Sequence, residues 1–218
     1  MIDRTRRHWP TASRALLSML MCGLLATSLQ GCIGLAIGTA VVGTIAASDR
    51  RTFGAQAEDK TIAVKAESRI PQLVGDGGHV NIASFNRKVL VTGEVRDEAL
   101  KAAVEREVSA IEGVNSVVNE LQVGGLSNYT SRSNDTLLTG KVKASFIDAR
   151  DLYANSIKVV TERGAVYLMG RVAQREANLA TEIARGVPGV QKVVRVFELI
   201  DESELRQLRN AESAPAAK

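Results

Sequence analysis

One pattern that occurs twice constrains the fold of this chain more than any other feature. Residues 59–123 and 135–199 carry similar sequences about 76 positions apart, and a single one-residue gap keeps their whole length in register. The run VLVTGEV at residues 89–95 matches VYLMGRV at residues 166–172. We therefore expect two copies of one small domain rather than one medium-sized domain.

Each copy reads as helix, strand, strand, helix, strand. In the first copy, Ile62, Ala66 and Ile70 recur at four-residue spacing, which indicates the buried face of a helix that Pro71 helps to end. Two runs rich in β-branched residues follow, and residues 85–87 between them form a connection short enough for a hairpin. The first copy should therefore pair these two strands in antiparallel fashion.

The second copy repeats this organisation, with Leu138, Val142 and Phe146 along its first helix. In both copies the last strand follows the second helix, so a right-handed crossover should place it parallel to the strand before that helix. The predicted fold class is α+β, with two tandem αββαβ domains, each a three-stranded mixed sheet covered on one face by two helices. Gly93 and Gly170 interrupt strand patterns, which predicts a bulge or a close approach of two backbones.

These patterns resemble the BON domain, in particular the V-x-L-x-G-x-V strand at residues 166–172 and the G-V-x-x-V-x-N-x-L run at residues 113–121. The resemblance covers nearly all of the chain after its N-terminal segment. It implies a non-enzymatic periplasmic protein that binds anionic phospholipid, such as phosphatidylglycerol or cardiolipin, and supports outer-membrane integrity. In two-domain lipoproteins of this family, the first helix of the second domain binds the lipid. Leu137 stands where that family has a tryptophan, and leucine lacks the interfacial preference of an indole.

The N-terminal segment has the layout of a bacterial lipoprotein signal peptide. A basic start is followed by the apolar residues 15–29, which are too few to span a bilayer, and the segment ends in the lipobox Leu29-Gln30-Gly31-Cys32. We predict cleavage after residue 31 and acylation of Cys32. The alternative is an ordinary secretory signal with an incidental cysteine. Ile33 is not the aspartate that retains lipoproteins in the inner membrane, which favours the outer membrane.

Charge and composition exclude several classes of function. Residues 1–31 hold four arginines and one aspartate, so removing them lowers the formal net charge from +4 to +1. The basic character of the whole chain is therefore no sign of nucleic-acid binding. The mature chain keeps one histidine, His79, and no cysteine besides Cys32, so we expect no catalytic residues, no metal site and no cofactor.

The first helix of the second copy carries the predicted lipid-binding face. Turned at 3.6 residues per turn, its outward side matches a face of the first copy that is more polar at two positions, where Thr61 and Ser68 stand in place of Leu137 and Ala144. Residues 59–123 hold eight basic and ten acidic side chains, whereas residues 135–200 hold ten basic and seven acidic. An apolar stripe flanked by lysines in a net positive domain suits an anionic headgroup layer. The predicted lipid-binding residues are Leu137, Gly140, Lys141, Lys143, Ala144 and Ile147.

Two alternatives remain open for this face. Scattered surface leucines are common, so the face need not bind anything. It also suits a protein partner, in which case the chain would be an interaction scaffold for outer-membrane protein assembly or for a secretion apparatus.

The expected organisation divides the chain into six segments. The order is signal peptide 1–31, lipidated N-terminus and tether 32–58, first BON domain 59–123, linker 124–134, second BON domain 135–200 and C-terminal tail 201–218, with a short helix expected early in the tail.

Overall fold

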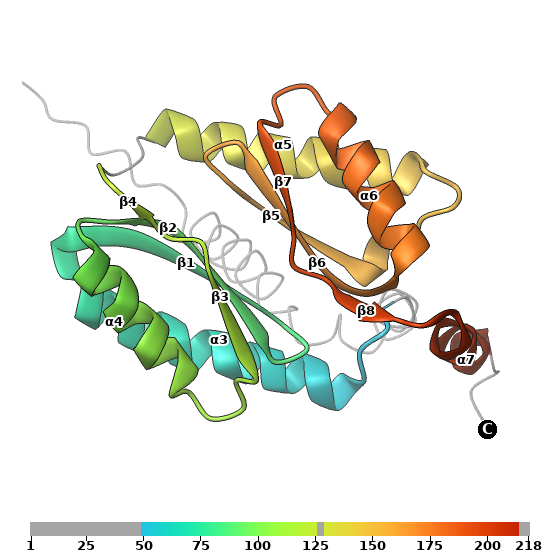
Figure 1. The fold of residues 1–218 in the computed structure, drawn as a ribbon, viewed down its shortest axis with the longest axis horizontal. Helices are drawn as coiled ribbons and strands as arrows, with labels where there is room; N and C mark the ends of the chain where they lie inside the picture. Colours follow the sequence, from blue (N-terminus) through green and yellow to red (C-terminus); the bar gives the residue numbers. More distant parts are fainter. Residues whose placement is uncertain (1–48, 126–128, 214–218) are drawn as a thin grey trace, which may run out of the picture. The chain divides into compact units, whose positions relative to one another are not determined.

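A computed structural model describes residues 49–125 and 129–213. The predicted signal peptide, Cys32, most of the tether and residues 214–218 lie outside the described residues. The described chain contains two successive units of the predicted αββαβ order, followed by a C-terminal helix (Figure 1). The α+β fold class predicted from the repeat is confirmed.

The first unit is built around a hairpin and a crossover helix. Its elements are α3 (Phe53–Val74), the short 3-10 turn η2 (Gly75–Gly77), β1 (Gly78–Phe85), β2 (Lys88–Val95), α4 (Glu98–Ser109), β3 (Ser116–Asn119) and β4 (Gln122–Val123). Strands β1 and β2 pair antiparallel over their full length, and β3 and β4 both run parallel to β2. The predicted last strand is thus present in two pieces.

The second unit repeats this topology. Its elements are α5 (Tyr129–Asp148), η3 (Ala154–Ser156), β5 (Ile157–Glu162), β6 (Ala165–Ala173), α6 (Gln174–Gly186), β7 (Lys192–Arg195) and β8 (Glu198–Ile200). Strand β5 pairs antiparallel with β6, and β7 and β8 run parallel to it. Helix α7 (Glu202–Ser213) follows, where a short helix was expected, and buries Leu205 against Ala173 and Ile200.

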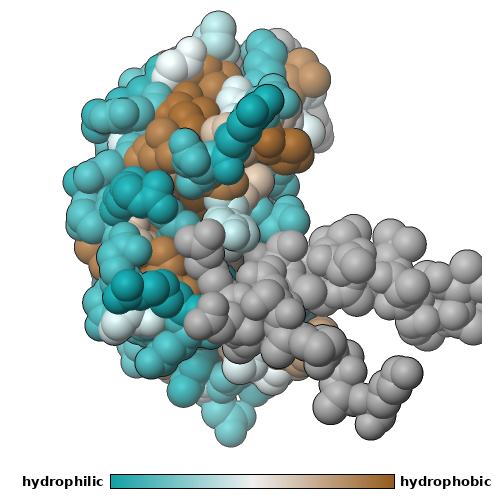
Figure 2. All heavy atoms as spheres, turned by 90° about the vertical axis from the view of Figure 1, so that its right-hand side faces the viewer, coloured by the Kyte–Doolittle hydropathy of each residue, from teal (hydrophilic) through white to brown (hydrophobic). Residues whose placement is uncertain are grey.

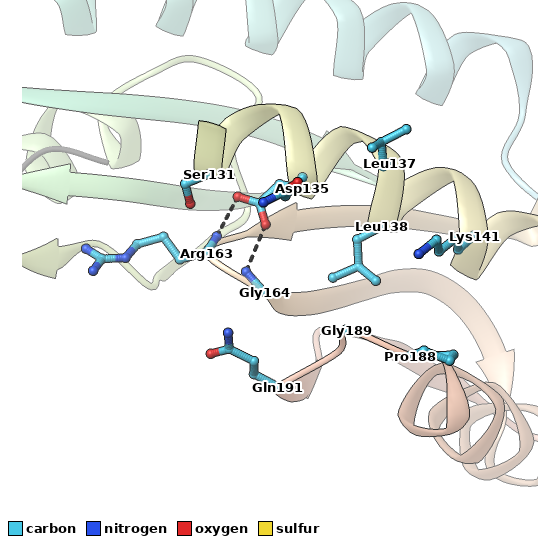
Figure 3. A pocket seen from close by; sticks show the side chains of 11 residues that line it. Ser131, Asp135, Leu137, Leu138, Lys141, Arg163, Gly164, Pro188, Gly189 and Gln191 are labelled. Atoms are coloured by element: carbon cyan, nitrogen blue, oxygen red, sulfur yellow. Dashed lines mark hydrogen bonds between the residues drawn. The ribbon is translucent and has the colours of Figure 1, made fainter. Parts of the chain in front are cut away.

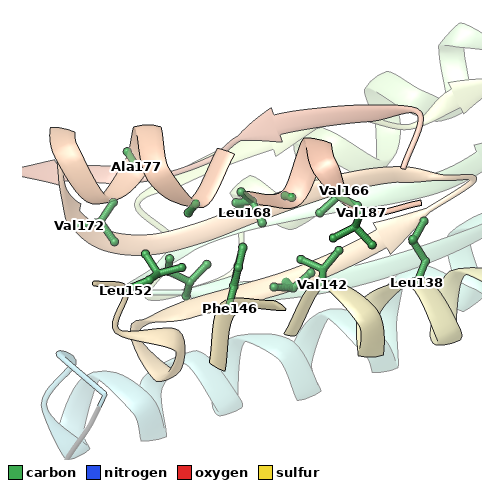
Figure 4. Close-up of a cluster of buried hydrophobic side chains, with 13 residues drawn as sticks. Leu138, Val142, Phe146, Leu152, Val166, Leu168, Val172, Ala177 and Val187 are labelled. Carbon is green, nitrogen blue, oxygen red and sulfur yellow. The ribbon is translucent and has the colours of Figure 1, made fainter. Parts of the chain in front are cut away.

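Each sheet is apolar on both faces, and the alternation along its central strand shows where each face packs. In β6, Val166 and Leu168 join the core beneath α5 and α6 (Figure 4), whereas Tyr167 belongs to a different cluster. In β2, Val89 and Val91 pack under α3 and α4. Because neighbouring side chains on a strand point to opposite faces, the second cluster is made by the faces that the helices leave uncovered.

That second cluster joins the two units. It contains buried apolar residues of both sheets, namely Ala83, Phe85 and Leu90 with Ala165, Tyr167, Met169 and Val196. Polar contacts surround it: Asn81 donates to the Glu162 carboxylate at 2.6 Å and Asn86 to the Glu198 carboxylate at 2.6 Å. Burial raises the pKa of Tyr167 to about 12. The two repeats therefore share apolar packing as well as having a core each.

Two helices begin earlier than the sequence predicted. Helix α3 begins at Phe53, inside the predicted tether, because Thr52 accepts a hydrogen bond from the backbone of Ala55 and caps the helix there. It also continues through Pro71, contrary to the prediction, and ends where the Gly75 amide bonds to the Pro71 carbonyl.

Helix α5 begins at Tyr129, inside the segment predicted as a linker. Residues 129–134 contain no glycine or proline, so a helix held by packing further along can extend backward through them. The predicted linker is therefore shorter than residues 124–134.

The predicted close approach of backbones occurs at both strand glycines. A Cβ atom on Gly93 would lie 2.0 Å from the carbonyl oxygen of His79, and one on Gly170 would lie 2.5 Å from that of Ser156. Gly93 also has a φ of +117°, which L side chains rarely adopt. Both glycines are thus required by the hairpins and do not form a ligand cradle.

Candidate functional site

Helix α5 has one buried face and one exposed face, as its sequence predicts. Leu138, Val142 and Phe146 point into the core of the second unit (Figure 4) and are buried. The opposite side carries Leu137 and Ile147, whose residues are 65% and 72% exposed. A helix in a soluble domain normally places polar side chains there, so two large exposed aliphatic residues on one helix mark this face for further examination.

All six residues predicted to bind lipid are exposed. Five of them lie along a single stripe, each three or four residues from another member, and these are Leu137, Gly140, Lys141, Ala144 and Ile147. Lys143 lies to one side of the stripe, toward Lys158 of β5. Burial lowers the pKa of Lys158, the charges of Arg51, Lys60 and Lys143 lower it further, and the nearby Asp59 carboxylate acts to raise it. The flank of the stripe that carries Lys143 therefore holds several cations together with one carboxylate.

An open hollow of about 510 Å³ adjoins the N-terminal half of this stripe (Figure 3). Leu137 and Lys141 line it from α5, Arg163 from the turn between β5 and β6, and Gln191 from the segment before β7. The Arg163 guanidinium lies 3.6 Å from the Glu94 carboxylate, so its charge is already partnered. Lys141, the Gln191 amide and the aliphatic wall form a surface that suits an anionic group attached to an apolar chain.

Asp135 also borders the hollow, but its role is structural. Its carboxylate accepts hydrogen bonds from the backbone amides of Arg163 and Gly164, both at 2.8 Å, and so fastens α5 to the β5–β6 turn (Figure 3). Both turn residues have positive φ, as a two-residue hairpin turn requires. Asp135 therefore holds the residues that line the hollow in place, and its carboxylate is occupied by these two backbone amides.

The first repeat uses Asp59 in the same way. Its carboxylate accepts bonds from the amides of Asn86 and Arg87 at 2.7 and 2.8 Å, from the Ser84 hydroxyl at 2.6 Å and from Arg51 at 2.7 Å. Although burial acts to raise it, these hydrogen bonds hold the pKa of Asp59 below its usual value. Asp59 and Asp135 are the first residues of the two repeated ranges, 59–123 and 135–199, and this coincidence is the sequence signal for their shared role.

The face of α3 that corresponds to the stripe differs in chemistry. Thr61 occupies the place of Leu137, and Ser68 that of Ala144. Val64 is exposed on α3, but Lys60 and Glu67 stand one turn before and after it. The first repeat thus presents a mixed surface, whereas the second presents an apolar one with lysines, and the exposed Asp148 stands at its C-terminal end.

Other kinds of site are missing from the part of the chain that the structure describes. Within residues 49–125 and 129–213, no three His, Cys, Asp or Glu side chains are placed to hold a metal ion. None of the helices in these same residues is both long and apolar enough to cross a membrane.

Comparison with known proteins decides the family. The BON-domain profile matches residues 58–125 and 134–201. This chain belongs to the BON-domain family. It is 38% identical over 176 residues to the outer membrane lipoprotein DolP of Haemophilus influenzae, a match that covers 79% of this chain and 91% of that protein. The chain is thus an outer-membrane lipoprotein that carries two BON domains on the periplasmic side.

Two further likenesses are weaker. The 21 kDa hemolysin of Actinobacillus pleuropneumoniae is 27% identical over 70% of this chain and 79% of its own length. Among solved structures, CdsD, a structural protein of the type III secretion system of Chlamydia trachomatis, aligns with 69% of this chain and 99% of that one at 12% identity and a TM-score of 0.28. That structural likeness is too distant to carry an argument about this chain.

Proposed function

We propose that this lipoprotein, acylated at Cys32, binds anionic phospholipid through the exposed stripe of α5 and thereby supports outer-membrane integrity, without catalysing a reaction. The observation that carries the proposal is the pairing of two exposed aliphatic residues, Leu137 and Ile147, with Lys141 and Lys143 on one helix of a net positive domain. Phosphatidylglycerol and cardiolipin are the expected lipids, because their headgroups are anionic.

The expected free energies of this contact are large enough for reversible membrane binding. Transfer of apolar surface from water contributes about 25 cal/mol per Å², so one largely exposed leucine contributes about 1–2 kcal/mol when it enters the acyl boundary. Each lysine near an anionic leaflet adds about 1 kcal/mol. Two aliphatic residues and two lysines therefore suffice for reversible docking but not for permanent attachment, which the acyl chains would provide.

Gly140 gives independent support for membrane contact through the α5 stripe. It stands in the middle of α5, where glycine destabilises a helix by about 1 kcal/mol relative to alanine. A Cβ atom there would meet open space, since no heavy atom lies within 4 Å of its position. The fold itself therefore does not require glycine, and a flat helix face that lets the backbone approach a headgroup layer explains its presence.

The test is vesicle binding by a matched pair of variants of residues 48–218, which lack the acyl anchor. Leu137→Glu should weaken binding to vesicles that contain phosphatidylglycerol or cardiolipin and leave folding intact, because Leu137 is outside the core. Thr61→Glu, at the matching exposed position of α3, should change little. Binding should fall as salt rises, since part of it is electrostatic.

Replacement of the leucine by the family's tryptophan extends this test. Leu137→Trp should increase vesicle binding because an indole favours the membrane interface. If the Leu137→Glu and Thr61→Glu variants bind anionic vesicles equally well at low salt, the assignment of the α5 stripe as the lipid-binding face is wrong. The stripe would then be better explained as a surface for outer-membrane assembly proteins.

A further inference from the structure

A buried ion pair joins the segment before α3 to the second repeat. The Arg50 guanidinium donates two hydrogen bonds of 2.7 Å to the Glu176 carboxylate and a third, of 2.9 Å, to the Arg171 carbonyl. The side chains of Arg50 and Glu176 are only 3% and 2% exposed. The guanidinium also lies 5.3 Å from the centre of the Tyr153 ring. A residue just ahead of the first repeat is thus fastened into the second.

Neighbouring contacts fix the same segment to the first repeat. Arg51 bonds to Asp49 and Asp59, and its guanidinium lies 4.1 Å from the centre of the Phe85 ring. Thr52 then caps α3. Residues 49–52 are therefore held on both sides, and Arg50, at the start of the described chain, lies against the second repeat.

Exposed apolar residues surround this point of departure. Phe53, three residues after Arg50, is 75% exposed. Tyr153 is exposed beneath the Arg50 guanidinium, and the exposed Leu199 pairs with Val172, the residue after Arg171. Figure 2 shows this side of the molecule, where the hydrophobic residues gathered in the upper part lie over α6 and the end of α5, above the start of α3 in Figure 1.

We propose that Phe53, Tyr153 and Leu199 form a second membrane contact, at the point where the acylated N-terminal segment enters the folded part of the chain. The occupant is the phospholipid interface, because Cys32 lies only 21 residues before Phe53 in sequence. Even when fully extended, 21 residues reach at most about 75 Å, so an anchor at Cys32 keeps Phe53 within that distance of the bilayer. Aromatic side chains favour the headgroup layer. The inference rests on the acylation that the proposed function assigns to Cys32.

The charges around this contact distinguish it from the stripe on α5. Glu176 neutralises Arg50, and the turn between α5 and Tyr153 carries Arg150 and Asp151, whose charges cancel. The named charges thus give this contact no excess of positive charge, whereas Lys141 and Lys143 supply attraction to anionic lipid on α5. Contact through Phe53 should be insensitive to salt, and contact through α5 should weaken as salt rises.

Tryptophan fluorescence of the full-length, acylated protein tests the proposal. The only tryptophan of the chain is Trp9, in the predicted signal peptide, so one added tryptophan reports on one site. Phe53→Trp, Leu137→Trp and the control Val64→Trp would each be reconstituted in vesicles of phosphatidylethanolamine and phosphatidylglycerol with brominated acyl chains. We expect Phe53→Trp to lose fluorescence and shift to the blue, and Val64→Trp, on the middle of α3, to do neither.

The three reporters separate the two hypotheses. Quenching of Phe53→Trp without quenching of Leu137→Trp supports this contact and contradicts the lipid stripe on α5, whereas the reverse overturns the contact and keeps the stripe. Shielding of Phe53→Trp from a water-soluble quencher, without quenching by brominated lipid, means that protein covers Phe53 and also overturns the contact. Equal quenching of all three reporters would mean that the protein does not meet the membrane through one defined surface, and this result also overturns the contact.

A further variant tests the role of the ion pair in this contact. Arg50→Gln, added to Phe53→Trp, should reduce the quenching toward the level of Val64→Trp, because the segment is released from the second repeat. Unchanged quenching would show that the anchor alone brings Phe53 to the membrane.

Discussion

The ion pair between Arg50 and Glu176 makes a quantitative prediction about stability. Removing one partner of a buried pair leaves the other charged group desolvated and costs about 3–5 kcal/mol. In Arg50→Ala, Glu176 keeps only its 3.1 Å hydrogen bond from the Ala173 amide. We expect Arg50→Ala to lower the free energy of unfolding by about 3 kcal/mol, which for a chain of this size lowers Tm by about 6–12 °C.

The stability lost in Arg50→Ala should depend on pH. Although burial acts to raise it, the hydrogen bonds from Arg50 hold the pKa of Glu176 below its usual value. A carboxylate with a depressed pKa stabilises the fold above its unfolded pKa of about 4.3, and that contribution disappears as the pH falls through the folded pKa. The difference between Arg50→Ala and the unaltered protein should therefore be full at neutral pH and shrink in acid.

Urea denaturation of four proteins is the assay: the unaltered chain, Arg50→Ala, Glu176→Gln and the double variant. The double variant should cost less than the sum of the two single variants because they remove the same interaction. Arg96→Ala is the control, since Arg96 and Asp97 form an exposed pair whose loss should cost under about 1 kcal/mol. If Arg50→Ala costs as little as Arg96→Ala, the segment before α3 is not fastened as described.

Three further predictions concern the anchor, the hairpin contacts and two glycines, one in strand β2 and one in helix α5. Cys32→Ala should block acylation and leave an uncleaved precursor, and normal labelling of this variant with radioactive fatty acid would show that another residue is modified. Asp59→Asn should destabilise the fold at neutral pH and progressively less below about pH 4, because the pKa of Asp59 is depressed; a loss independent of pH in denaturation curves would contradict this. Gly93→Ala should cost about 3 kcal/mol from its clash and positive φ, whereas Gly140→Ala should stabilise by about 1 kcal/mol, both measurable as midpoint shifts.

Local patterns were enough to predict the architecture of each repeat. The four-residue spacing of Leu138, Val142 and Phe146 identified the buried side of α5, and that also identified its exposed side. The close backbone approach at Gly93 and Gly170 could be predicted because a glycine inside a strand usually marks a bulge or such an approach. These features depend on neighbours within a few residues, which is the range that periodicity describes.

Helix boundaries and long-range polar contacts were beyond that range. The start of α5 lies in a polar stretch, and only packing further along the chain holds it helical. Arg50 and Glu176 are 126 residues apart, and neither stands in a motif. The residues around Tyr167 and Met169 were correctly predicted to form a strand. Their packing against Phe85 and Leu90 of the first repeat could not be predicted, because local periodicity carries no information about which distant residues meet.

The cluster shared by the two sheets has a consequence for how such duplicated chains evolve. After duplication, the outer sides of α3 and α5 were free to diverge, and their present surfaces differ in polarity. Leu90 and Phe85 meet Tyr167 and Met169 across the cluster, so a change of volume on one side must be matched on the other. Related chains with two repeats should show covariation between these positions. Deletion of either copy would leave an apolar sheet face in water, which makes the duplication hard to reverse.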